Sequence, residues 1–156
     1  MIWLKKLKEK WLAENAISES AVDDNYLSLF QEKNDVRLPD DLIEYFKSLN
    51  GTGGDYADDF YKFYSIDRIR KVKEEFKNWH GVPNYQDILS INNINDLYVF
   101  ADFNCNLFAY AIELRSKFAN KNDVYILCGE NYKKIANSFS EFIDLYLKDA
   151  IELQFS

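Results

Sequence analysis

Acidic and aromatic side chains alternate in the stretch from Asp55 to Tyr61. Carboxylates attract a cationic protein over a distance, and aromatic side chains supply the contact area that holds it after encounter. The pattern therefore predicts a surface that binds a basic protein, and an ordinary solvated loop is the alternative interpretation. The residues of this first patch are Asp55, Tyr56, Asp58, Asp59 and Tyr61.

A second patch of polar and aromatic positions follows in a segment rich in β-forming residues and in the turn after it. These side chains could also contact a partner, although the edge of a sheet would present similar residues. The residues of this second patch are Asp96, Tyr98, Asp102 and Asn104.

The acids of the first patch could also hold a cation, and three glycines precede them. Asp55, Asp58 and Asp59 lack the alternate-position spacing and the closing glutamate of a calcium-binding loop. A phosphate-binding glycine loop opens a helix, whereas Gly51, Thr52 and Gly53 follow one. We therefore expect neither a metal nor a cofactor.

The sequence contains no convincing catalytic group. Nucleophilic catalysis by serine or cysteine needs a base, and the single histidine, His80, stands beside Gly81, where a helix is expected to end. Cys105 and Cys128 lack the spacing of metal ligands. Nothing selects a hydrolytic pair among the 26 acidic residues. We expect no catalytic residues, and a hydrolase is only a third class of function.

Composition narrows the class of partner. The 156 residues fit a single domain over 1–156, and the formal net charge of −7 disfavours nucleic acid and anionic membranes. Seven acidic and two basic residues lie between Asp35 and Asp59. Lysines interrupt the apolar start of the chain, so we expect no secretory signal and a cytoplasmic, reduced protein.

One helix organises the rest of the chain, and the sequence marks both of its ends. Pro39 suits the first helical position, and Asp40 and Asp41 place negative charge at the positive end of the helix dipole. Asn50 and Gly51 end the helix. Leu42, Phe46 and Leu49 form an apolar stripe that must pack on a larger core.

The remaining segments predict an α+β fold in which an antiparallel sheet of about four to six strands packs with N-terminal helices and a C-terminal helix. Residues 2–14 are amphipathic and basic, which favours a helix docked on its own domain over a membrane-surface or calmodulin-binding helix. Other helices are expected after a cap at Ser18 or Ser20, along Ile69 to Trp79, and after a capping box at Ser138 and Glu141. In the first of these, Val22, Tyr26, Leu29 and Phe30 would form the apolar face. Strands are expected over 60–64, 97–103, 107–114, 124–127 and 132–136.

Three short motifs occur in a characteristic order. They are Leu38-Pro39 followed by two aspartates, Asn50-Gly51 at the end of an apolar helix, and Ser138-Phe139-x-x-Phe142 after an apolar strand pair. In this order they resemble the SUKH superfamily (Smi/Knr type), over roughly residues 20–148. The resemblance implies that Leu38, Pro39, Asn50, Gly51, Ser138 and Phe139 are structural.

The resemblance also implies a function without catalysis. Bacterial SUKH proteins mostly bind and neutralise a toxin, often a nuclease or deaminase, whereas eukaryotic relatives are regulatory interaction proteins. We therefore expect a non-enzymatic, cytoplasmic immunity protein whose partner is a basic, nuclease-type toxin domain. The alternative is an intracellular regulatory or scaffold module with no toxin partner. The oligomeric state stays open.

Overall fold

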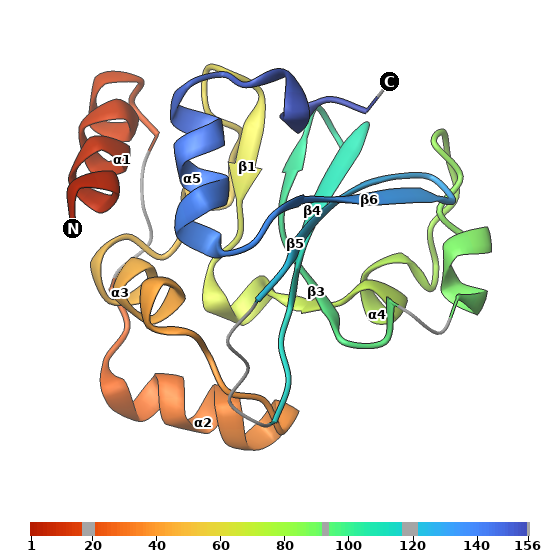
Figure 1. Ribbon diagram of the computed structural model, residues 1–156, viewed down its shortest axis with the longest axis horizontal. Helices are drawn as coiled ribbons and strands as arrows, with labels where there is room; N and C mark the ends of the chain where they lie inside the picture. The colour runs from red at the N-terminus through yellow and green to blue at the C-terminus, as the bar shows by residue number, and fades with distance from the viewer. Residues whose placement is uncertain (17–20, 92–93, 117–121, 156) are drawn as a thin grey trace.

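The computed structural model describes residues 1–16, 21–91, 94–116 and 122–155 (Figure 1). It confirms the predicted α+β class. The helices are α1 (Ile2–Ala13), α2 (Asp24–Asn34), α3 (Asp40–Ser48), α4 (Val72–Phe76) and α5 (Phe139–Leu147), with short 3-10 helices η1 (Ile66–Arg68), η2 (Asp87–Ser90) and η4 (Ile151–Leu153). The strands are β1 (Tyr61–Phe63), β2 (Arg70–Lys71), β3 (Leu97–Phe103), β4 (Phe108–Glu113), β5 (Val124–Cys128) and β6 (Asn131–Ala136).

The six strands form one antiparallel sheet in the order β1-β3-β4-β5-β6, and β2 also pairs with β3. β1 and β2 both pair with β3, at different places along it: Tyr61 is opposite Phe103, and Arg70 is opposite Val99. The turn between β3 and β4, at Asn104, Cys105 and Asn106, has positive φ at all three residues, as turn-forming asparagines allow. The predicted central hairpin is confirmed.

Helix α3 has the predicted apolar stripe, with Leu42 and Phe46 buried, and Tyr45 buried beside them. Pro39 is the N-cap rather than the first helical residue. The Asp41 carboxylate accepts hydrogen bonds from the backbone N–H of Leu42 (2.8 Å) and of Ser140 at the start of α5 (2.8 Å). One side chain therefore joins the beginnings of α3 and α5.

The turn after α3 requires its two residue types. The buried Asn50 side chain accepts a hydrogen bond from the Ile66 backbone N–H (2.8 Å). Gly51 has φ +91°, and a Cβ there would lie only 2.7 Å from the Phe63 carbonyl oxygen. Any other residue would be strained and would push β1 away.

Helix α2 differs from the prediction in its cap and its buried face. Ser18 and Ser20 lie outside the described residues, and the observed cap is Asp23, whose carboxylate accepts from the Tyr26 N–H (2.9 Å). Leu27 and Phe30 face the core, whereas Tyr26 and Leu29 are exposed. The predicted apolar face was counted from Val22, which lies before the first residue of the helix. The count therefore assigned Tyr26 and Leu29 to the buried face.

The continuous helix predicted along Ile69 to Trp79 is wrong. After η1, this segment forms β2 and then only the short helix α4. β2 is extended because it pairs with β3, and both Arg68 and Arg70 bond the almost fully buried Glu75 carboxylate. Tertiary pairing therefore overrides a local helical period.

The two ends of the chain pack on the same core as the sheet. Helix α1 lies beside α5 (Figure 1) and buries Leu7 and Trp11, as the docked-helix interpretation predicted. The Trp11 indole donates to the Tyr146 hydroxyl (3.1 Å). At the start of α5, the Ser138 hydroxyl accepts from the Glu141 N–H (3.1 Å), which confirms the predicted cap.

Candidate functional site

The structure brings the first patch together with the far end of the second. Residues 51–60 lead into β1, and the Asn104 N–H donates to the Phe60 carbonyl (2.9 Å), so the loop and the β3–β4 turn are neighbours. Both lie at the upper end of the sheet in Figure 1. We call the exposed and half-buried residues here the loop surface: Asp55, Tyr56, Asp58, Phe60 and Asn104.

A buried carboxylate holds the loop surface to the sheet. Asp102 is 1% exposed and accepts hydrogen bonds from the hydroxyls of Tyr56 (2.7 Å) and Tyr64 (2.6 Å) and from the Asn106 N–H (3.0 Å). Burial, together with the neighbouring Asp102 carboxylate, raises the pKa of both tyrosines far above the usual range. The Tyr56 side chain is therefore fixed by a neutral hydroxyl that donates to a buried acceptor.

Replacing Asp102 by Asn should reduce the free energy of unfolding by about 2 kcal/mol, because charge-assisted hydrogen bonds in the interior are lost. Amide hydrogen exchange in residues 52–60 should become faster, since Tyr56 loses its acceptor. The matched control is Asp58→Asn, an exposed change expected to alter stability by less than about 0.5 kcal/mol. Equal stability of the two variants would show that Asp102 does not hold the loop.

Several predicted contact residues are instead part of the scaffold. The side chains of Tyr61, Tyr98 and Asp102 are buried, so they add little to the exposed surface of the protein. Tyr61 packs its ring on Phe103 (4.9 Å between centroids) because alternate residues of β1 face the core.

Asp59 is half-buried and already has partners within the chain. Its carboxylate accepts from the Tyr146 hydroxyl (2.6 Å) and the Tyr61 N–H (3.1 Å), and it lies 3.3 Å from the Lys10 ammonium. A contact with a partner through Asp59 would have to share these bonds.

Asp96 and Tyr98 lie at the opposite end of β3 from Asp102, so the second patch is not one surface. The Asp96 carboxylate is exposed and lies 3.8 Å from the Arg115 guanidinium. Burial raises the pKa of Tyr98 to about 12, which agrees with a place inside the fold. Only Asp102 and Asn104 of the second patch adjoin the loop surface.

Phe60 is the most unusual residue of the loop surface. Its side chain is 61% exposed and its backbone has φ +69°, a conformation that costs energy for a bulky residue. Hydrogen bonds hold it there, since its N–H donates to the Ala57 carbonyl (2.9 Å) and its carbonyl accepts from Asn104. The patch prediction omitted Phe60. The signal was available, because adjacent residues at a strand point in opposite directions and Tyr61 points inward.

The positions of the sequence motifs explain the family assignment. Leu38 and Phe139 are buried, Asn50 and Gly51 shape the turn into β1, and Ser138 caps α5. Comparison with known families matches residues 21–145 to the SMI1 / KNR4 family (SUKH-1). The chain belongs to this SUKH family. None of the curated proteins compared with it matches.

Segments outside the SUKH match complete the site. Helix α1 and the residues after α5 lie beyond 21–145, yet Leu7, Trp11 and Leu153 are buried in the same core as the SUKH region. Lys10 of α1 reaches Asp59 of the loop. The surroundings of the loop surface are thus built partly by residues that the family pattern does not include.

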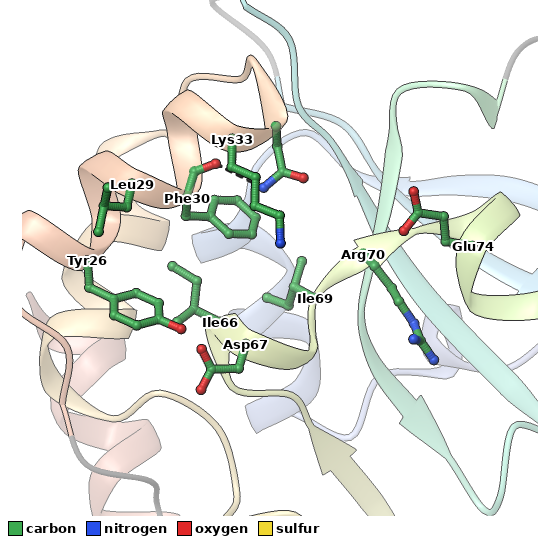
Figure 2. Close-up of a pocket in the computed structure, with 10 residues that line it drawn as sticks. Tyr26, Leu29, Phe30, Lys33, Ile66, Asp67, Ile69, Arg70 and Glu74 are labelled. Atoms are coloured by element: carbon green, nitrogen blue, oxygen red, sulfur yellow. Dashed lines mark hydrogen bonds between the residues drawn. The ribbon is translucent and has the colours of Figure 1, made fainter.

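A groove of about 590 Å³ lies beside α2 (Figure 2). Tyr26 and Leu29 of α2 form one wall, and Ile66 and Ile69 lie opposite them. The charged residues of the groove have both signs: Lys33 and Arg70 are basic, and Asp67 and Glu74 are acidic. This SUKH protein therefore offers a second surface that could hold a partner but would not attract one charge over the other.

A smaller hollow of about 340 Å³ adjoins Phe60. Its walls are aromatic and acidic, with one lysine. They include Lys10, Asp59, Phe60, Tyr61, Phe103, Tyr146 and Asp149.

Two properties of the described residues bear on cofactors and membranes. They contain no group of three or more His, Cys, Asp or Glu side chains placed to hold a metal ion. No helix among them is both long enough and apolar enough to cross a membrane.

Proposed function

We propose that this SUKH protein is a non-enzymatic, cytoplasmic immunity protein that binds a basic, nuclease-type toxin domain through the loop surface and blocks it stoichiometrically. The meeting of the first patch with the β3–β4 turn carries the proposal. Acids and aromatic rings from residues 55–60 lie beside Asn104 of the turn on one exposed surface, and the Asp102 hydrogen bonds hold it in place before binding. Preorganisation of this kind reduces the entropic cost of association.

Charge supports the same partner class. Asp55 and Asp58 are exposed, and in the described structure neither lies in an ion pair. The whole chain has a formal net charge of −7, so its field favours approach by a basic domain. A nuclease domain is basic because it binds the negatively charged phosphate backbone of its substrate.

The alternative, a regulatory or scaffold module, is favoured by a different surface. The groove between α2 and the segment 66–70 has an exposed apolar wall at Tyr26 and Leu29 and charges of both signs, which would suit a partner selected by shape. The two functions therefore predict different binding surfaces on the same chain.

The first experiment mixes the purified protein with the product of the neighbouring gene. We expect a complex of one to one stoichiometry and loss of the nuclease activity of that partner. A complex without loss of toxicity would support the scaffold alternative.

A second experiment locates the surface by association kinetics. The double variant Asp55→Asn/Asp58→Asn removes two exposed charges and keeps Asp59, whose bonds support the fold. We expect a roughly three- to tenfold slower association at low salt, with the difference disappearing near about 0.5 M salt, because rim charges act through steering.

The matched control is Asp67→Asn/Glu74→Gln, which removes the same charge from the groove. Association at the wild-type rate in the loop variant, with a slower rate in the groove variant, would move the interface to α2.

A further inference from the structure

We propose that the hollow beside Phe60 receives the guanidinium group of one arginine from the protein partner. This inference rests on the proposed function and adds to it a residue-level contact, in which Asp149 lies outside the family region of residues 21–145. It also assigns Phe60 and Asp149, which neither predicted patch contains, to the binding surface.

The hollow has the shape and chemistry of a cation receptor. Rings of Phe60, Tyr61, Phe103 and Tyr146 surround it, and Asp59 and Asp149 contribute carboxylates. Aromatic faces attract cations, and carboxylates bond them directly. A neutral apolar side chain would leave the Asp149 carboxylate without compensation.

The chain itself shows that this place stabilises a cation. The Lys10 ammonium lies 3.3 Å from an Asp59 oxygen and 5.2 Å from the centroid of the Tyr146 ring, and it also pairs with Glu14. Burial alone would lower the pKa of Lys10, but its hydrogen bonds with Glu14 and Asp59 outweigh burial and raise the pKa. Lys10 therefore stays charged and compensates Asp59 and Glu14.

Asp149 is left to bind a second cation. Its side chain is exposed, and within the described residues it has no cation within ion-pair distance. Asp149 lines the same hollow as the rings of Phe60, Tyr61 and Tyr146, so one ligand in the hollow can contact both the carboxylate and an aromatic wall.

Arginine fits this arrangement better than lysine. A guanidinium is planar, so it can stack on a ring such as Phe60 while its edge donates two hydrogen bonds to the Asp149 carboxylate. An ammonium is more strongly hydrated and has no flat face. The exposed, strained Phe60 has no evident packing purpose, whereas it would cover the outer face of a bound guanidinium.

The first test uses a small probe and needs no toxin. N-acetyl-arginine amide and N-acetyl-lysine amide are titrated into the full chain, and the NMR signals of Phe60 and Asp149 are followed. We expect saturable shifts with the arginine compound at millimolar concentration and at least threefold weaker binding of the lysine compound. Asp149→Asn should abolish the saturation. Equal response to both probes, or no response, would overturn the proposal.

The second test uses the complex with the partner. Phe60→Asn keeps a residue that tolerates positive φ, so the fold should be retained. We expect dissociation to be about thirtyfold faster for Phe60→Asn and about tenfold faster for Asp149→Asn. The increase in the double variant should be smaller than the product of the two single increases, because both residues contact the same arginine. The control is Leu29→Asn, a side chain that is also 61% exposed but lies on α2.

The two tests separate this inference from the proposed function. If Phe60→Asn and Asp149→Asn both dissociate from a neutralised toxin at the wild-type rate, the arginine-binding proposal is contradicted and the proposed immunity function is not. If the protein binds the arginine compound through Asp149 but neutralises no neighbouring toxin, the proposed immunity function is contradicted and the arginine-binding proposal is not.

Discussion

Unfolding at alkaline pH should be abrupt, beginning above about pH 10, where tyrosine ionises in an unfolded chain. Burial raises the pKa of Tyr45, Tyr64, Tyr110 and Tyr146 far above this value in the folded protein. The folded state therefore keeps protons that the unfolded state loses, so stability is fully present below about pH 10 and falls as the pH rises. Each such group removes about 1.4 kcal/mol per pH unit, so four of them remove most of a typical domain's stability within about two units.

The measurement follows phenolate absorbance and circular dichroism in one pH titration. The four buried tyrosines should ionise together with unfolding. Tyr45→Phe removes one of the four groups and should make the loss of stability with pH less steep. Gradual ionisation of all tyrosines with an unchanged dichroism spectrum would contradict the expectation.

Replacing Phe46 by Ala should lower the free energy of unfolding by about 3–5 kcal/mol, because it leaves a cavity in a close-packed interior. Phe46 is fully buried in α3, with the Tyr45 ring 5.2 Å away. Chemical denaturation measures the change. The control, Leu29→Ala, truncates an exposed side chain of α2 and should change stability by less than about 1 kcal/mol. An equal loss of stability in the two variants would contradict the interpretation that α3 organises the fold.

Local signals account for the parts of the fold that could be predicted. Asn50 and Gly51, the turn at Asn104, and the cap at Ser138 each act within a few residues, so the sequence reports them directly. The failure along Ile69 to Trp79 has a non-local cause. Two residues of β2 pair with β3 almost thirty positions later, and no local pattern records that pairing.

The sequence indicated the composition of the candidate loop but not which of its side chains are exposed. Two neighbouring aromatic residues differ in this respect, because Tyr61 is buried and Phe60 is exposed. In β3, Leu97 to Asp102 are all buried, because both faces of this central strand are covered. A polar residue such as Asp102 must then satisfy its oxygens inside the fold, and only the three-dimensional structure shows that its donors are Tyr56 and Tyr64.

The bond from Asp41 to the Ser140 N–H has a consequence for the order of synthesis. The two residues are 99 positions apart in the chain, and Phe139 next to Ser140 packs its ring 4.9 Å from Tyr45. A growing polypeptide that already contains α3 cannot cover Tyr45 until nearly all of the protein has been translated. Completion of the fold therefore waits for α5, and a product that stops before Ser138 leaves the apolar side of α3 open to chaperones and proteases.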